Sequence, residues 1–261
     1  MTVDGRLEIN RRRWDEMARL HLATYDQAMG DDATCSLKPF EVAELGDVNG
    51  KRICHMQCHL GADSLSLARQ GAHVVGVDFS PEAIVNARSC SEDTGVHADF
   101  VLSSVEEARE KLEGEFDVVY TSWGVLCWLP DLGAWAQTIG SLLCPGGFLY
   151  LAETHPYAQA LRRNERSYGG GEATFDNSQG DYTDDCAVFE HPESWEWSHG
   201  LGDVVTAVAD AGLRIDFVHE HPLVAWHLND AERLVRRLDG MWERPESSLP
   251  LSFSLKATKP G

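Results

Sequence analysis

The chain has 261 residues, and its 22 Lys and Arg side chains against 42 Asp and Glu side chains give a formal net charge of −20. This acidic balance argues against a nucleic-acid-binding protein, because phosphate backbones are bound by clustered Lys and Arg side chains. With 43% hydrophobic and 25% charged residues, the composition excludes a wholly disordered chain. The length fits one large α/β domain with one insertion or cap.

The N-terminal sequence and the cysteines predict a cytoplasmic protein. The first residues contain no apolar stretch that could act as a signal peptide, and the seven cysteines are odd in number and scattered along the chain. The uncharged stretch 132–152 is long enough to span a bilayer, but Pro145-Gly146-Gly147 divides it. We therefore expect a helix, a turn and a buried strand there, and no membrane partner.

The first predicted element is a helix over residues 7–30. Side chains that recur at helical spacing share one face of it, namely Trp14, Met17, Ala18, His21 and Tyr25. We expect this helix to precede the sheet and to lie over the ends of its strands.

From residue 51 to residue 153, strand-like apolar runs alternate with amphipathic, helix-like stretches, which predicts a parallel sheet built from βαβ units. The predicted strands are 52–56, 73–79, 100–103, 116–121 and 147–152. Ser80 and Asp131 are the predicted N-caps of the helices that follow them. Ligands of such sheets bind beyond the carboxyl ends of the strands.

Residues 156–197 are rich in Gly, Asp, Tyr and Trp and follow no single periodicity. A stretch of this length inside a compact domain is typically a functional insertion, and we interpret it as a lid. A helix over 201–211 and strands over 213–219 and 251–256 then bring the predicted strands to seven. We therefore expect a single domain with four parts: a helical cap at 1–46, a core at 47–155, the lid insertion at 156–200 and closing elements at 201–261.

The most unusual segment follows the first predicted strand and is His55-Met56-Gln57-Cys58-His59-Leu60-Gly61-Ala62-Asp63. It aligns with the first-strand signature of the class I S-adenosylmethionine (SAM) dependent methyltransferases, an acidic residue followed by a Gly-rich turn. Only Gly61 of the usual glycines is present, and the pattern Q-C-H-x-G-x-D is similar to that of one subgroup of this family. The resemblance implies an α/β fold with a Rossmann-like seven-stranded, mostly parallel sheet, helices on both faces, an N-terminal helical cap and a lid insertion after the fifth strand.

The resemblance also implies SAM as the cofactor and S-adenosylhomocysteine (SAH) as its product. It places Gln57 and His59, beside Gly61, near the methionine carboxylate or amine of the cofactor, with Asp63 supporting them. In the alternative interpretation, Gln57, His59 and Asp63 bond only to one another and hold the turn.

Asp78, at the end of the second strand, is implied to accept both ribose hydroxyls, which suits the two oxygens of a carboxylate. Phe79 is implied to pack against the adenine. The alternative, in which Asp78 only caps the next helix, is weaker because Ser80 occupies the cap position. The further contacts that the resemblance implies are Ser104 and Val105 after the third strand, Ser122 and Trp123 after the fourth, and Tyr25 in the N-terminal helix.

Catalytic residues are predicted at the end of the fifth strand, where this fold places the acceptor. His155 titrates near neutrality and is the predicted general base, with Glu153 as the alternative base or as the partner that orients it. The alternative interpretation is structural: Glu153 anchors the N-terminal helix and His155 caps a turn. An aromatic cage over a cationic group is a further hypothesis, and it draws on Trp14, His21, Tyr25, Tyr168, Tyr182, Trp195, Trp197 and His199.

Together these features predict the transfer of a methyl group from SAM to an O, N or C atom of a small-molecule acceptor. No GxGxxG follows the first strand, which argues against a nicotinamide dinucleotide. His55 and His59 have a metal-ligand spacing but straddle a strand end and a turn, so we expect no metal site. The alternatives are a SAM-binding enzyme that does not methylate, such as a SAM cyclase, a lyase or a pericyclic catalyst, and a non-catalytic SAM- or SAH-binding module. The sequence leaves open whether the chain is a monomer or a homodimer.

Overall fold

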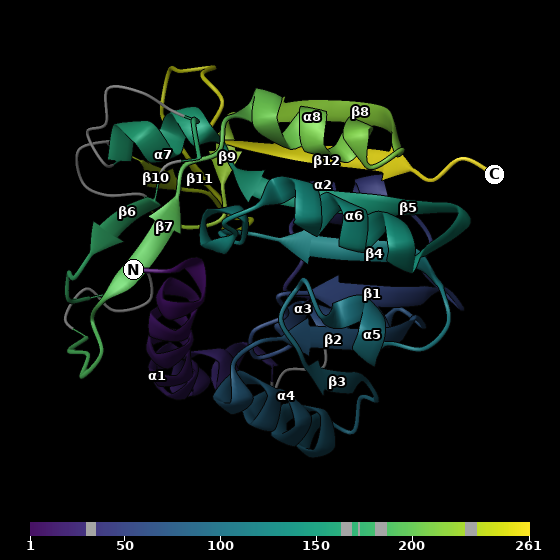
Figure 1. The fold of residues 1–261 in the computed structure, drawn as a ribbon, viewed down its shortest axis with the longest axis horizontal. Helices are drawn as coiled ribbons and strands as arrows, with labels where there is room; N and C mark the ends of the chain where they lie inside the picture. Colours follow the sequence, from purple (N-terminus) through teal and green to yellow (C-terminus); the bar gives the residue numbers. More distant parts are fainter. Residues whose placement is uncertain (30–34, 163–168, 172, 181–186, 228–233) are drawn as a thin grey trace.

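The computed structural model describes residues 1–261 except 30–34, 163–168, 172, 181–186 and 228–233, and it describes only the backbone of residues 23–29 and 161–162. A seven-stranded sheet runs through the middle of the molecule (Figure 1) in the order β3-β2-β1-β4-β5-β12-β8. Neighbouring strands pair in parallel except at β12, which is antiparallel to both β5 and β8. The strands are β1 (Arg52–Met56), β2 (His73–Asp78), β3 (Asp99–Leu102), β4 (Phe116–Ser122), β5 (Leu143–Thr154), β8 (Arg214–His221) and β12 (Ser252–Thr258).

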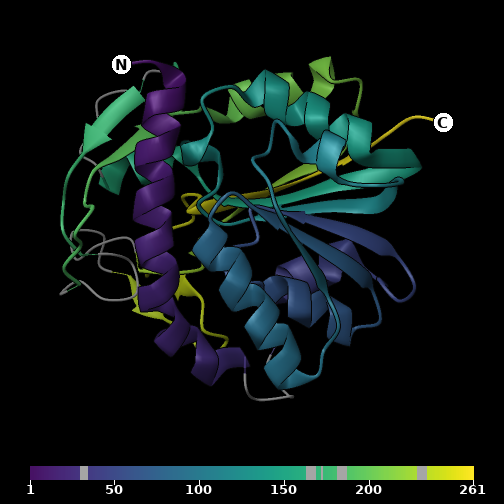
Figure 2. The ribbon, with the colours of Figure 1, turned by 60° about the horizontal axis from the view of Figure 1, so that its bottom comes forward.

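Helices cover both faces of this sheet (Figure 2). One face carries α2 (Pro39–Leu45), α3 (Ala62–Arg69) and α4 (Pro81–Thr94), and the other carries α5 (Ala108–Lys111), α6 (Leu132–Leu142) and α8 (Leu201–Asp210). Each strand contributes side chains to the hydrophobic cores on both faces of the sheet, because successive side chains point to opposite faces. In β4, for example, Val119 packs with α6 and α8, whereas Val118 and Tyr120 pack with α2 and α3.

Among the described residues, two smaller sheets lie outside the central one. In the lid insertion, β6 (Ala173–Asp176) and β7 (Ser194–Trp197) pair as an antiparallel ribbon. Near the end of the chain, β9 (Leu223–Val224), β10 (Val235–Arg236) and β11 (Trp242–Glu243) form a three-stranded sheet. The 3₁₀ turn η1 (Leu126–Trp128) follows β4, and α7 (Pro156–Arg162) follows β5.

The N-terminal helix α1 (Val3–Met29) packs along α4 and contacts the lid ribbon, the pair of strands β6 and β7 (Figure 2). The Asn10 side-chain amide donates to the Trp195 carbonyl and accepts from the Trp195 N–H, both at 2.7 Å. The Glu16 carboxylate accepts the backbone N–H groups of Glu190 and His191 at 2.7 and 2.9 Å. The helical cap and the described part of the lid therefore hold each other in place.

The structure confirms the predicted fold class. All seven predicted strands form, and the largest difference is β5, which extends beyond the predicted 147–152 at both ends because its flanking residues pair with β4 and β12. Both predicted N-caps are confirmed, since the Ala83 N–H donates to Ser80 Oγ at 3.1 Å and the Ala134 N–H donates to Asp131 Oδ1 at 3.0 Å. No helix in the described part of the chain is both long and apolar enough to cross a membrane.

Candidate functional site at the carboxyl ends of the strands

The turn between β1 and α3 has a left-handed backbone at three alternate positions, with φ of 55° at Gln57, 50° at His59 and 78° at Gly61. A residue with a side chain adopts this conformation at a cost of about 1–2 kcal/mol, so the turn keeps a glycine-like backbone where glycines are absent. A Cβ at position 61 would lie 2.7 Å from the Phe100 ring. Gly61 is therefore the position where a side chain has no room.

The Gln57 side chain leaves one polar atom unsatisfied. Its Nε2 donates to the Val125 carbonyl at 3.1 Å. Its Oε1 is buried and has no hydrogen-bond partner among the described residues. A buried amide oxygen without a donor is destabilising by about 1–3 kcal/mol, so this atom is suited to a ligand that brings an N–H or O–H group.

His59 is held by the cap helix. Its Nε2 lies 2.9 Å from Nδ1 of His21 in α1, and the Trp14 ring meets it edge-on at a centroid distance of 5.2 Å. Trp14 also contacts Trp128 of η1. These contacts confirm that α1 lies over the ends of the strands, here those of β1 and β4.

The Asp78 carboxylate is buried at the end of β2 and supports the same turn. The His59 N–H donates to its Oδ2 at 2.8 Å and the Ser80 N–H donates to its Oδ1 at 2.9 Å. Burial raises the pKa of Asp78 to about 6, against the opposing effect of these N–H groups. Each oxygen can still accept a second hydrogen bond, so the carboxylate can receive two hydroxyl groups.

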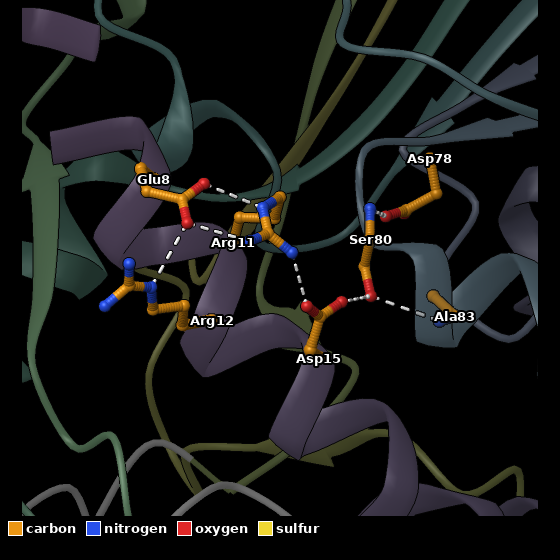
Figure 3. Close-up of polar contacts among 7 residues, drawn as sticks. All are labelled: Glu8, Arg11, Arg12, Asp15, Asp78, Ser80 and Ala83. Atoms are coloured by element: carbon orange, nitrogen blue, oxygen red, sulfur yellow. Dashed lines mark hydrogen bonds and ion pairs between the residues drawn. The ribbon is translucent and has the colours of Figure 1, made fainter. Parts of the chain in front are cut away.

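A relay of polar contacts joins Asp78 to the cap helix (Figure 3). Ser80 caps α4, and its hydroxyl donates to Asp15 of α1 at 2.6 Å. Asp15 in turn pairs with Arg11 at 2.6 Å. The cap helix therefore contacts both residues whose backbone N–H groups bind Asp78: Asp15 contacts Ser80, and His21 contacts His59.

Asp63 lies in a polar cluster on the other side of the turn. Its carboxylate accepts the hydroxyls of Ser36, Ser122 and Tyr120 at 2.5, 3.0 and 3.2 Å. Tyr120 also lies 2.8 Å from Glu41, which is fully buried. Gln57, His59 and Asp63 thus each bond to a different element, in contrast to the alternative in which they bond to one another.

Glu41 makes the stability of the fold depend on pH. Burial, and then the charge of Asp63, raise its pKa from 4.5 to about 7. A carboxyl group with a raised pKa in the folded state does not affect stability below pH 4.5, where both states are protonated. As the pH rises to about 7, the unfolded chain loses the proton first, so the free energy of unfolding falls, by roughly 3 kcal/mol at 1.36 kcal/mol per pH unit.

We therefore expect Glu41→Gln to remove this dependence. The free energy of unfolding is measured by urea denaturation for the variant and for the unmodified chain. The value for the variant minus the value for the unmodified chain should increase from pH 5 to pH 8. Glu92→Gln, at an exposed position of α4, is the matched control and should leave the pH dependence unchanged. Parallel pH profiles for Glu41→Gln and the unmodified chain would contradict the raised pKa.

The other predicted cofactor contacts lie around the same strand ends. Phe79 is half-buried after β2, and Val105 is buried within the loop after β3. Ser104 accepts the Glu107 N–H at 3.3 Å through its hydroxyl. Trp123 has a φ of 46° and packs edge-on against the rings of Phe40 and Trp226. The side chain of Tyr25 lies outside the described residues, as do Tyr168 and Tyr182 of the predicted aromatic cage.

Glu153, a predicted base, has both carboxylate oxygens occupied by backbone N–H groups. Its Oε1 accepts from Gly124 and Thr154 at 2.7 and 2.6 Å, and its Oε2 accepts from Val125 and Leu126 at 2.8 and 3.1 Å. Burial raises its pKa, and the four N–H groups oppose that effect. The carboxylate thus fixes the segment after β4, which differs from the predicted anchoring of the N-terminal helix.

His155, the first predicted base, has both ring nitrogens in hydrogen bonds. Its Nδ1 accepts the Tyr157 N–H at 3.1 Å at the start of α7, and its Nε2 lies 3.0 Å from Glu220. Because Nδ1 accepts, Nε2 carries the proton and donates it to the carboxylate. Burial lowers the pKa of His155, which favours this neutral form. The geometry matches the structural alternative, in which His155 caps a turn.

A pocket opens beside Glu153, between η1, β5, α7 and the lid strand β7. Its wall combines apolar surface with polar side chains, and the described residues that line it are Leu126, Cys127, Glu153, Thr154, Pro156, Gln159, Ala160, Gly169, Trp197, Ser198, His199 and Phe253. Leu126 follows Val125, whose carbonyl binds Gln57. The pocket and the β1–α3 turn are therefore separated by the segment that Glu153 holds.

Two polar side chains in this pocket have hydrogen-bonding capacity to spare. The His199 Nε2 lies 2.7 Å from the Leu129 carbonyl, and burial lowers the pKa of the ring, partly offset by that carbonyl and by Asp203 and Asp131. Thr154 Oγ1 is buried and has no hydrogen-bond partner among the described residues. Thr154 was missed by the sequence analysis, although it stands between the two predicted bases, and His199 was considered only as a member of the aromatic cage.

Comparisons with known proteins agree with this geometry. Residues 55–149 match the family described as methyltransferase domain. The core of this chain is thus similar to a methyltransferase domain. A ubiquinone biosynthesis O-methyltransferase from Xanthomonas euvesicatoria is 38% identical over 117 residues, which are 44% of this chain and 48% of that relative. The chain thus spans about half the length of the curated relatives it matches.

Solved structures share the fold of this chain. A SAM-dependent methyltransferase from Methanosarcina mazei has a TM-score of 0.58 at 19% identity, covering 86% of this chain and 98% of its own. The magnesium protoporphyrin IX methyltransferase of Synechocystis PCC 6803, solved with bound SAH, has a TM-score of 0.52 at 19% identity, covering 92% and 83%. Likeness at this level of identity concerns the fold alone.

No cluster of three or more His, Cys, Asp or Glu side chains in the described part of the chain could hold a metal ion. His55, the first residue of the segment that aligns with the first-strand signature, bonds through Nδ1 to Ser64 Oγ at 2.8 Å and packs edge-on against Tyr120. Burial lowers its pKa to about 4, so the ring is neutral at pH 7. His55 therefore holds α3 against β1.

Proposed function

We propose that this chain binds SAM and transfers its methyl group to a small-molecule acceptor. One observation carries the proposal: at the ends of adjacent strands β1 and β2 of a methyltransferase domain, two buried acceptors retain unused lone pairs. These are Gln57 Oε1 and the Asp78 carboxylate. Buried polar groups are normally hydrogen-bonded, so the pair supports a ligand with donors at both ends.

The donors of SAM match these acceptors. Its ammonium group suits Gln57 Oε1, and its two ribose hydroxyls suit the Asp78 carboxylate, which already accepts one N–H on each oxygen. Phe79, Ser104 and Val105 remain the proposed contacts to the adenine. When bound, the cofactor supplies an electrophilic methyl group on a sulfonium.

The residues near the pocket would serve mainly to position the acceptor and exclude water, which supply much of the acceleration of a displacement reaction. Glu153 and His155, whose polar atoms are engaged, are proposed to shape the site rather than to move protons. The names of the curated relatives favour oxygen as the methylated atom. We therefore propose an O-methylation.

Titration calorimetry with SAM, SAH and NAD in parallel tests the cofactor. We expect micromolar binding of the two sulfur ligands and none of NAD. Absence of binding by both sulfur ligands would contradict the proposal. Consumption of SAM without a methylated product would instead indicate the non-methylating alternative.

Replacement of Asp78 tests where the cofactor lies. We expect Asp78→Ala to weaken SAM binding by about 1–3 kcal/mol, because charge-assisted hydrogen bonds to the ribose are lost. Asp78→Asn keeps one acceptor oxygen and one of the two backbone hydrogen bonds to the carboxylate, so it should lie between Asp78→Ala and the unmodified chain. Asp99→Ala is the control, because Asp99 is exposed at the amino end of β3, away from the carboxyl ends of the strands. Unchanged affinity in both folded Asp78 variants would remove the ribose assignment.

A further inference from the structure

The wall of the pocket beside Glu153 is more apolar than polar. Trp197 and Phe253, both buried, contribute aromatic wall, and no Lys or Arg is among the described residues that line it. An anionic acceptor would therefore find no positive charge in this wall, while Glu153 adds a negative one. A neutral acceptor fits this environment better than a phosphate or a carboxylate.

The ring of His199 is fixed in the tautomer that a proton acceptor needs. A backbone carbonyl can only accept a hydrogen bond, so the ring nitrogen that lies 2.7 Å from the Leu129 carbonyl, Nε2, must carry the proton. In the neutral ring, Nδ1 then bears a lone pair. Because burial lowers the pKa of His199, the ring is neutral at pH 7 despite the carboxylates of Asp131 and Asp203.

Thr154 supplies an independent sign that this pocket takes a polar ligand. The residue is 2% exposed and lines the same pocket, and its hydroxyl has no hydrogen-bond partner among the described residues. A hydroxyl can both donate and accept. It can therefore bind a second polar atom of a molecule whose first polar atom meets His199.

From these observations we propose that His199 is the general base of the reaction and that the acceptor is a neutral phenol or enol whose second oxygen binds Thr154. This inference rests on the proposed function. The acceptor oxygen forms a bond to the methyl carbon with a lone pair, and the electrons of the broken C–S bond remain on sulfur as a neutral thioether. The hydroxyl proton passes to His199 Nδ1 and from there to solvent, which balances the reaction.

His155, which follows β5, and His199, which follows β7, have different roles. His155 holds the start of α7 through Nδ1 and bonds Glu220 through Nε2, so it has no lone pair to offer. His199 reaches the pocket from the segment that follows β7. The lid thus contributes the base, and an acceptor in the pocket is enclosed between β5 and the lid residue that deprotonates it.

The test uses protein labelled with ¹⁵N in the histidine rings, loaded with SAH and titrated at pH 7 with catechol, a neutral phenol that carries a second oxygen. Before the phenol is added, the ring of His199, assigned with His199→Asn, should show a protonated Nε2 and an unprotonated Nδ1. On addition, its Nδ1 resonance should move toward the protonated position. His199→Asn should weaken catechol binding about tenfold, and Thr154→Val severalfold, while the Nδ1 shift persists in Thr154→Val. His97→Asn, exposed before β3, should change neither.

The outcomes separate the two proposals. Failure of SAH to bind contradicts the proposed function before any phenol is added. Binding of SAH with no binding of catechol contradicts the acceptor class. A protonated Nδ1 before catechol is added, or equal catechol affinity in His199→Asn, contradicts the base. For an acceptor that turns over, kcat/KM of His199→Asn should fall at least about a hundredfold and lose its dependence on a group titrating below pH 7, which a purely structural role would not produce.

Discussion

Replacing Glu153 with Gln should destabilise the fold by about 2–4 kcal/mol. The amide would place an NH₂ group against two of the four N–H donors that the carboxylate now accepts, at Gly124 and Thr154 or at Val125 and Leu126. Each lost bond to a charged group is worth about 1.5–3 kcal/mol and leaves a buried donor unpaired. Part of this loss is offset because the neutral amide is easier to bury than the carboxylate, whose pKa burial raises.

Urea denaturation at pH 8 measures this effect. Glu107→Gln is the matched control, since this carboxylate pairs with Lys111 on the surface and is 59% exposed; the control should change stability by no more than about 0.5 kcal/mol. A Glu153→Gln protein with unchanged stability and abolished turnover would restore the catalytic role that its position at the end of β5 first indicated.

Local patterns predicted the elements of the sheet because each strand repeats a short-range rule. The alternation of apolar and polar residues, together with the cap residues Ser80 and Asp131, located helices and strands within a few residues of the observed ends. The lid ribbon of β6 and β7 was not predicted. Its short strands are stabilised by α1, more than 150 residues away in sequence, through Asn10 and Glu16.

The proposed base shows why site chemistry is harder to predict than site position. His155 and His199 are both histidines near strand ends, and sequence alone favoured His155 because it follows β5 directly. Which nitrogen of each ring is available depends on partners distant in sequence, the Leu129 carbonyl for His199 and Glu220 for His155. Such contacts leave no local pattern in the sequence.

The turn between β1 and α3 was predicted only in part. The loss of glycines at Gln57 and His59 indicated that side chains take over part of the turn's role, and the structure shows the left-handed backbone retained there. The Gln57 bond to Val125 and the His59 contact with His21 could not be predicted, because they join β1 to a loop and a helix from other parts of the chain.

Gly61→Ala should destabilise the chain by about 3 kcal/mol, and more if the Phe100 ring cannot move. Two costs combine: about 1–2 kcal/mol for a left-handed backbone with a side chain, and about 1–3 kcal/mol for overpacking a Cβ that would lie 2.7 Å from the ring. Gly95→Ala isolates the first cost, because that glycine has a φ of 66° and no atom within 4 Å of its Cβ position. Its expected loss is about 1 kcal/mol.

The difference between these two variants measures the contact that makes glycine necessary at position 61. Phe100→Leu removes the ring edge, so Gly61→Ala should cost less in that background than in the unmodified chain, by at least about 1 kcal/mol in a double-mutant cycle. Additive losses would show that the backbone conformation alone selects glycine. Position 61 would then differ from Gln57 and His59 only because no side-chain hydrogen bond compensates for its left-handed backbone. The contact with Phe100 would not explain why glycine is present there.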